Sequence, residues 1–172
     1  EIKSMYIMGE NPAMSDPDQN HAREALAKLD HLVVQDIFMT ETAWHADVIL
    51  PTSAHAEKTG TFTNTNRQVQ LGRQAVSPPG DARQDWWVTQ AIAQRMGLDW
   101  SYLHPRDIFN EMSQVMPSLN NITYERLETE NSVTYPCDSP DKPGNEIIFN
   151  ERFPTANGRG KIVPARLIPP AE

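Results

Sequence analysis

The chain has 172 residues, of which 38% are hydrophobic and 22% charged, a composition typical of folded globular proteins. Its net charge of −8 argues against general nucleic-acid binding, which needs clustered basic residues. No apolar run approaches the roughly 20 residues that a membrane span requires, and no signal-peptide core opens the chain. The single cysteine, Cys137, excludes an internal disulfide and fits a reducing compartment, so we expect a cytoplasmic protein.

The first fifty residues alternate between strand-like and helix-like patterns. Short apolar runs predict three strands, over residues 5–8, 32–34 and 47–50. A helix is expected over residues 18–29, with Asp16 as its N-cap and a proline in its first turn. A short helical turn is expected near Thr40. Strands that are continuously apolar and separated by helices are typical of a parallel sheet. We therefore predict the α/β fold class, as a three-layer, Rossmann-like domain with a mainly parallel sheet.

The remaining chain predicts a polar loop, three helices and an irregular extension. Residues 52–70 are rich in Thr, Asn and charged side chains and are expected to form a loop, followed by an irregular stretch to Gly80. Apolar spacing predicts three helices, at residues 85–96, from Pro105, and at 124–127. Two hairpin-like pieces are expected in the extension, at residues 147–149 and 161–163.

Polar residues follow each of the three predicted strands. They are Gly9, Glu10 and Asn11 after the first strand, Gln35 and Asp36 after the second, and Thr52 and Ser53 after the third, while Asn11 and Ser15 lie ahead of a helix N-terminus. In open α/β sheets, ligands bind at this edge, outside the carboxyl ends of the strands. A following helix N-terminus also favours phosphate. The same residue types form ordinary turns and caps, so ligand binding and turn formation both remain open for each position.

Asp85 also has two possible roles. It precedes the predicted helix over residues 86–96 and is expected to be its N-cap. Its two carboxylate oxygens could instead accept from two adjacent donors. The N1–H and 2-amino group of guanine present such a pair, whereas adenine does not.

No pattern in the sequence predicts a metal site or a catalytic centre. The five histidines have neither the i, i+4 spacing of a helical metal site nor a neighbouring cysteine. Cys137 lies between a proline and an aspartate, where a structural or incidental thiol is the simpler interpretation. We therefore predict no metal ligand and no catalytic residue in this chain.

Several long motifs resemble the molybdopterin oxidoreductase family, and within it the catalytic (alpha) subunit of formate dehydrogenases. They are a G-E-N-P turn, the run V-Q-D-I-F-x-T-x-T-A-x-x-A-D-V-I-L-P and the block E-x-x-G-T-F-T-N-x-x-R, followed by ARQDWWV, YPC and FPTANGRG. The resemblance spans residues 5–164. It implies that residues 1–130 form an internal α/β domain for molybdopterin guanine dinucleotide. Residues 131–172 would be an irregular extension and linker toward a missing C-terminal domain.

The resemblance also implies a cofactor and a set of binding residues. The parent enzyme would hold a bis(molybdopterin guanine dinucleotide) with molybdenum or tungsten, and iron–sulfur clusters would be held outside this segment. One dinucleotide arm would be lined by residues from all three strand ends and by the guanine-binding carboxylate: Gly9, Asn11, Ser15, Gln35, Asp36, Thr52 and Asp85. The Cys or selenocysteine followed by His that carries the metal in this family is absent, because Asp138 follows Cys137.

The implied parent function is formate oxidation to carbon dioxide, with electrons passing to other subunits. The segment itself would be an inactive fragment that carries no cofactor alone and needs the remaining domains of its subunit. Two alternatives stay open. The parent could be another reductase of the same superfamily, such as a nitrate reductase, or the segment could be a non-catalytic scaffold domain that has kept the fold and lost the cofactor.

Overall fold

The computed structural model describes residues 2–167 and divides into two compact units. Unit 1 comprises Glu1–Thr59 and Gly72–Leu103, and unit 2 comprises Gly60–Leu71 and His104–Glu172. The units interleave along the chain, so their limits differ from the boundary expected at residue 130. Whether residues 1–130 act together as a cofactor-binding domain stays a prediction.

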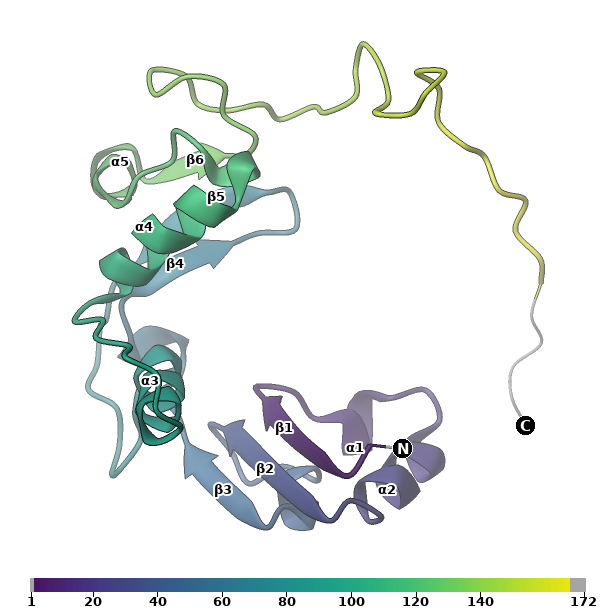
Figure 1. Cartoon of the computed structure of the whole chain (residues 1–172), viewed down its shortest axis with the longest axis vertical. Helices are drawn as coiled ribbons and strands as arrows, with labels where there is room; N and C mark the ends of the chain where they lie inside the picture. Colours follow the sequence, from purple (N-terminus) through teal and green to yellow (C-terminus); the bar gives the residue numbers. More distant parts are fainter. Residues whose placement is uncertain (1, 168–172) are drawn as a thin grey trace. The chain divides into compact units, whose positions relative to one another are not determined.

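Unit 1 is built on a parallel sheet with the strand order β1-β2-β3 (Figure 1). The strands are β1 (Ser4–Met8), β2 (His31–Asp36) and β3 (Val48–Pro51). Three helical segments connect or follow them: α1 (Pro12–Ser15), α2 (Gln19–Leu26) and α3 (Asp85–Arg95). A 3₁₀ turn at Ala43–His45 stands near the helical turn expected after β2. The predicted α/β class and parallel sheet are confirmed.

The core of unit 1 lies between the sheet and α1 and α2. Alternate residues of β1 and β2, Ile7, Leu32 and Val34, pack with Ala13 of α1 and Leu26 of α2. This is the pattern expected when every second strand residue faces the same side of a sheet. The opposite face keeps three large side chains 39–43% exposed: Tyr6, Met8 and Val48.

The predicted cap of the first helix was wrong. Asp18, not Asp16, caps α2 and accepts a hydrogen bond from the His21 amide at 3.1 Å. Asp16 instead ends the short helix α1, which the sequence did not predict. A residue that precedes proline is disfavoured in the helical region, and Asp16, before Pro17, is extended with ψ 138°. Helix α2 therefore begins at Gln19, one residue later than expected.

Unit 2 combines a second small sheet with two helices. Its sheet has the order β4-β5-β6, with strands β4 (Gly60–Thr63), β5 (Gln68–Gly72) and β6 (Ser132–Thr134). Two helices accompany it, α4 (Pro105–Val115) and α5 (Tyr124–Glu130), near the positions predicted. The core is apolar and is formed by Val69, Phe109, Leu119, Ile122, Tyr124, Leu127, Val133 and Cys137.

Strands β4 and β5 lie inside the stretch that was predicted to be a loop. Of the two strands, only Val69 is buried, at 1% exposure, opposite Val133 of β6. A single buried position gives no apolar alternation to detect. The turn between the strands contains Arg67 at φ 67°. Its guanidinium donates to the carbonyls of Tyr135, Asn145 and Glu146, which joins the turn to the chain after β6.

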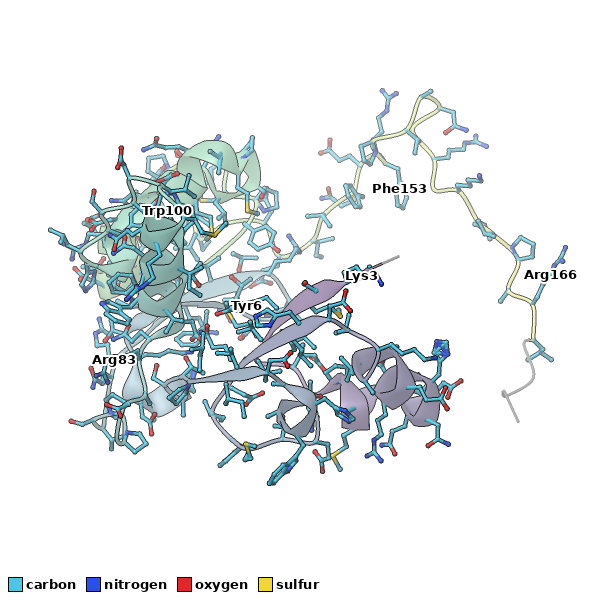
Figure 2. The ribbon with its side chains drawn as sticks, turned by 60° about the horizontal axis from the view of Figure 1, so that its bottom comes forward. Lys3, Tyr6, Arg83, Trp100, Phe153 and Arg166 are labelled. Carbon is cyan, nitrogen blue, oxygen red and sulfur yellow. The ribbon has the colours of Figure 1, made fainter. Side chains whose placement is uncertain are left out.

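The expected irregular extension is present, but its hairpin-like pieces are not strands. Residues 135–167 contain no helix or strand, and Phe153 and Arg166 lie on this irregular trace (Figure 2). Ile147 is 72% exposed and Ile162 94% exposed. These apolar residues have little packing within the described chain, so nothing stabilises them as paired strands.

Candidate functional site

The carboxyl ends of the three parallel strands meet at one edge of unit 1. Backbone hydrogen bonds continue the ladder beyond the strands, from the Gly9 amide to the Gln35 carbonyl at 2.9 Å and from the Thr52 amide to the Asp36 carbonyl at 3.2 Å. Gly9 has φ +61°, with no atom within 4 Å of the place a Cβ would take. Glycine adopts this conformation without strain. The strand ends that the sequence predicted are therefore adjacent in the structure.

The segment before α3 brings a fourth element to this edge. Arg83 forms a parallel bridge with Thr52, its carbonyl accepts from the Ser53 amide at 2.9 Å, and its amide donates to the Pro51 carbonyl at 3.2 Å. Asp85 follows as the first residue of α3, and Gln84 is the N-cap, without a side-chain cap bond. The predicted capping role of Asp85 was therefore wrong. Its carboxylate is engaged elsewhere.

The Asp85 carboxylate is the centre of a hydrogen-bond network. Its Oδ1 accepts from Gln35 Nε2 at 2.9 Å and from Thr52 Oγ1 at 2.7 Å. Its Oδ2 accepts from Lys58 Nζ at 2.5 Å. Gln35 is fully buried and its Oε1 accepts from the hydroxyl of Tyr6 on β1, which Figure 2 labels. The network thus ties β1, β2, the end of β3 and the start of α3 together.

This network holds Asp85 in its ionised form. Burial raises the pKa of Asp85, but hydrogen bonds from Lys58, Thr52 and Gln35, together with the charge of Lys58, outweigh burial and leave the pKa below its usual value. The pKa of Tyr6 is raised, first by burial and then by the negative charge of Asp85. At neutral pH the edge therefore presents a carboxylate paired with one ammonium group.

An open cavity of about 390 Å³ lies against this edge. It is lined by backbone and side chains from all four elements: Met8, Gly9, Asp36, Ile37, Thr52, Ser53, Ala54, His55, Lys58 and Asp85. Ser53 is 1% exposed, and its hydroxyl has no hydrogen-bond partner within the described chain. Buried hydroxyls normally have a partner, so this one marks a position that a bound polar group could complete.

The seven predicted site residues do not all lie at this cavity. Gly9, Asp36, Thr52 and Asp85 line it, and Gln35 lies behind Asp85 as its hydrogen-bond donor. The two residues of the first loop are placed elsewhere. The side-chain amide of Asn11 donates to Glu41 at 2.7 Å and accepts from Thr42 at 2.8 Å, and Ser15 donates to Glu10 at 2.9 Å. These bonds hold the loop before α2, and neither residue lines the cavity.

Three residues of the site were not in the predicted set. Tyr6 and Lys58 join the Asp85 network, and Ser53 contributes the unpartnered hydroxyl. The strand-end rule placed Ser53 beside Thr52 at the end of the third strand, but Ser53 was not carried into the predicted cofactor-binding set. Lys58 lies in a stretch predicted to be a loop, and no spacing rule connects it with an aspartate 27 residues later. Its role became visible only in three dimensions.

Among the described residues 2–167, neither the pattern of a metal site nor that of a membrane-spanning helix is present. Within that range no group of three or more His, Cys, Asp or Glu side chains is arranged to hold a metal ion. Within the same residues no helix has the length and apolar character needed to cross a bilayer.

Known proteins resemble this chain in sequence over nearly its whole length. The F420-dependent formate dehydrogenase subunit alpha of Methanocaldococcus jannaschii is 51% identical over 165 residues, covering 95% of this chain and 24% of the relative. The F420-dependent formate dehydrogenase 2 subunit alpha of Methanococcus maripaludis is 44% identical over 166 residues, with the same two coverages. The chain therefore spans about a quarter of the length of these relatives.

A third relative, a putative formate dehydrogenase of Staphylococcus haemolyticus, is 44% identical over 164 residues, which are 95% of this chain and 17% of that protein. Among solved structures, acetylene hydratase from Pelobacter acetylenicus matches with a TM-score of 0.62 and 24% identity, over 77% of this chain and 18% of the hydratase. That likeness shows the fold alone. The sequence model of the molybdopterin oxidoreductase family matches residues 1–95, and the chain belongs to that family.

Proposed function

We propose that unit 1 contributes part of the binding site for one arm of a molybdopterin guanine dinucleotide. The observation that carries this proposal is the Asp85 network beside a cavity that lies at the carboxyl ends of parallel strands. Ligands of open α/β sheets bind at that edge. Family membership supplies the class of cofactor, and the cavity supplies a place for it.

The residues present fit a nucleotide. Asp85 offers an ionised carboxylate, and Ser53 has a buried hydroxyl without a partner in residues 2–167. Gly9 leaves open space where a side chain would otherwise stand. In this proposal Asp85 accepts from the two donors of the guanine edge, because charge-assisted hydrogen bonds to a carboxylate are roughly twice as strong as neutral ones. Gln35 and Thr52 hold that carboxylate in place.

Asn11, Ser15 and Asp36 stay in the proposed set with less direct roles. Asp36 lines the cavity, and its Oδ1 accepts from the Ile37 amide at 2.6 Å, which fixes the turn after β2. Asn11 and Ser15 hold the loop between β1 and α2. We propose that they shape this loop for the dinucleotide and that the hydroxyl of Ser15, the last residue of α1, donates to a phosphate group.

We further propose that the chain is part of a formate dehydrogenase alpha subunit, which oxidises formate to carbon dioxide in the cytoplasm. The relatives at 44–51% identity carry that name. The bound cofactor, with molybdenum or tungsten, supplies the two-electron redox chemistry. Residues outside this chain would hold the metal, the second dinucleotide and the iron–sulfur clusters, and further subunits would take the electrons. This chain orients the cofactor and, in this proposal, is inactive alone.

The test uses the full-length subunit that contains this chain. Asp85→Asn replaces one acceptor oxygen by a donor, so we expect reduced molybdopterin guanine dinucleotide content and, in proportion, reduced formate-dependent dye reduction. Asp81→Asn is the matched control, because Asp81 is four residues away and its side chain is 96% exposed. Full cofactor content in Asp85→Asn would exclude the proposed guanine contact. Equal losses in both variants would show a general effect of removing a carboxylate.

A further inference from the structure

The Asp85 carboxylate has too few open positions for two new donors. A carboxylate has about four lone-pair sites, two on each oxygen. In the structure Oδ1 accepts from both Gln35 and Thr52, and Oδ2 accepts from Lys58. One site remains, on Oδ2. A guanine edge needs one acceptor on each oxygen when it binds in a bidentate manner, so at least one of the present donors must move.

The three donors differ in how readily they can leave. Gln35 is fully buried, and its amide oxygen is held by Tyr6. Thr52 has a single hydroxyl hydrogen with two acceptors in reach, Asp85 Oδ1 at 2.7 Å and the Arg83 carbonyl at 2.9 Å. It can therefore release Oδ1 by rotating toward Arg83 without losing a hydrogen bond. Gln35 is the fixed donor and Thr52 the exchangeable one.

Lys58 occupies the place where a ligand would approach. Its side chain and that of Asp85 are 25% and 27% exposed, and both residues line the cavity. A lysine ammonium on a flexible four-carbon stem is a mobile point charge. The ion pair lies at the cavity wall, so a ligand that reaches Asp85 must pass or displace the ammonium group. The unpartnered hydroxyl of Ser53 at the same cavity points independently to a bound group.

We propose that Lys58 competes with the guanine edge for Asp85: its ammonium group pairs with Oδ2 while the site is empty and is displaced when guanine binds. This inference rests on the proposed guanine-binding role of Asp85. A nucleobase without two adjacent donors cannot replace the ammonium group and leaves the ion pair intact. Lys58 therefore weakens the binding of guanine and leaves the binding of adenine unchanged.

The size of this effect follows from the competition. When only a fraction of the protein molecules is in the binding-competent state, the apparent affinity for the ligand is the intrinsic affinity multiplied by that fraction. Here the competent state is the one in which Lys58 has left Asp85. A partly exposed ion pair is worth little more than other surface pairs, so removing Lys58 should strengthen guanine binding about 3- to 10-fold. Loss of the positive charge would weaken every phosphate-bearing ligand alike. The ratio of the affinities for GMP and AMP cancels that common contribution.

The experiment titrates GMP and AMP into the cofactor-free full-length subunit that contains this chain, with isothermal titration calorimetry as the readout. For Lys58→Met we expect the GMP-to-AMP affinity ratio to rise about 3- to 10-fold above that of the unmodified subunit. Lys58→Arg, which keeps the ion pair, should leave the ratio at or below its original value. Lys28→Met removes an exposed lysine of the same unit and serves as the matched control, with no change in the ratio.

The outcomes separate this inference from the function on which it rests. If the unmodified subunit prefers GMP and the ratio is unchanged or lower in Lys58→Met, the displacement of Lys58 is wrong and the guanine site stands. If neither protein prefers GMP to AMP, the guanine assignment of Asp85 fails and the role of Lys58 fails with it. A preference that appears only in Lys58→Met would support displacement most strongly.

Discussion

The strand-end edge of unit 1 and the core of unit 2 use buried residues in opposite ways. Unit 2 buries apolar side chains around α5 and β5, and Thr134 is its one buried polar residue among those described. Unit 1 buries five polar side chains among the described residues: Gln35, Thr42, Thr52, Ser53 and Gln90. Gln35 and Thr52 donate to Asp85, and Ser53 lines the cavity. Thr42 and Gln90 make hydrogen bonds elsewhere in the unit. Burying a polar side chain costs free energy because its hydrogen bonds to water are lost, and only a hydrogen bond within the protein or to a ligand offsets that cost.

Because of this difference, substitutions in the two regions should affect different properties, namely folding stability in unit 2 and ligand binding at the edge of unit 1. Apolar burial is the main favourable term of folding, so unit 2 should respond to substitution chiefly by losing stability. The edge of unit 1 is arranged around one ionised carboxylate and has an unpartnered hydroxyl. Buried polar groups of this kind lower the stability of the fold while the cavity is empty, and a bound ligand that hydrogen-bonds to them would restore that stability. Substitutions at this edge should therefore change ligand binding more than folding.

The largest effect is expected in the core of unit 2. Leu127 is fully buried in α5, and Leu127→Ala should lower the free energy of unfolding by about 2–5 kcal/mol, through lost transfer energy and the cavity left behind. Urea unfolding followed by far-UV circular dichroism measures this loss. All four tryptophans, Trp44, Trp86, Trp87 and Trp100, lie in unit 1, so their fluorescence reports on that unit separately. A loss below about 0.5 kcal/mol, the usual range for surface substitutions, would contradict the core assignment.

A smaller loss is expected for Asp85→Asn, at about 1–2 kcal/mol. The asparagine oxygen can still accept from Gln35 and Thr52, but its amide group would then face the Lys58 ammonium, donor against donor. Tryptophan fluorescence during urea unfolding measures the change. An unchanged midpoint would show that the ion pair with Lys58 contributes nothing to the ligand-free fold.

The same pair predicts a pH dependence. The pKa of Asp85 is lowered in the folded chain, while an aspartate in the unfolded chain has a pKa of about 3.9. The stabilisation is therefore complete above about pH 4 and is lost as the pH falls through the folded-state pKa. The difference in unfolding free energy between the unmodified chain and Asp85→Asn should shrink over that range. If the difference grew on acidification, the pKa of Asp85 would be raised in the folded chain rather than lowered.

Gly9→Ala should cost about 1–2 kcal/mol, from backbone strain alone. Gly9 has φ +61°, and no atom lies within 4 Å of the position that the alanine Cβ would occupy, so the penalty is that of placing an L-residue in the left-handed region. Urea unfolding monitored by tryptophan fluorescence gives the value. If Gly9 also allows close approach of a nucleotide, Gly9→Ala should weaken the binding free energy of GMP by more than it lowers the free energy of unfolding. A GMP affinity equal to that of the unmodified protein would argue against close approach at Gly9.

The smallest effect on stability is expected for Ser15→Ala. The Ser15 hydroxyl makes an exposed hydrogen bond to Glu10, and surface substitutions of this kind usually stay within about 0.5 kcal/mol. Binding of GMP compared with guanosine then tests the proposed phosphate contact. Weaker GMP binding with unchanged guanosine binding would assign Ser15 to the phosphate, whereas no change in either would leave it as a loop residue.

The predicted sheet and the actual sheet agree because each strand has a continuous apolar run, as in Leu32-Val33-Val34. Parallel pairing then aligns the strand ends, which is why Gly9, Asp36 and Thr52 could be placed together from the sequence. Strands β4 and β5 could not be predicted, because tertiary pairing with β6 rather than apolar alternation stabilises them.

The site was predicted less completely than the sheet. Asp85 was identified for its chemistry but given a capping role that belongs to Gln84, because a difference of one residue at a helix start is below what sequence patterns resolve. Lys58 was missed altogether. Its contact with Asp85 depends on how the chain after β3 returns past the strand ends, and side-chain contacts between distant segments have no local signal.

Nucleotide selectivity is the most direct test of the proposal that Asp85 binds the guanine edge. Titration of the cofactor-free full-length subunit with GMP, IMP and AMP varies the base while the phosphate and ribose stay the same, and IMP lacks only the 2-amino donor. We expect GMP to bind most tightly, IMP less tightly and AMP least tightly, with each lost donor weakening binding by about 0.5–3 kcal/mol. In Asp85→Asn the three affinities should become similar. Equal affinities for the three nucleotides, or selectivity that survives in Asp85→Asn, would contradict the proposal.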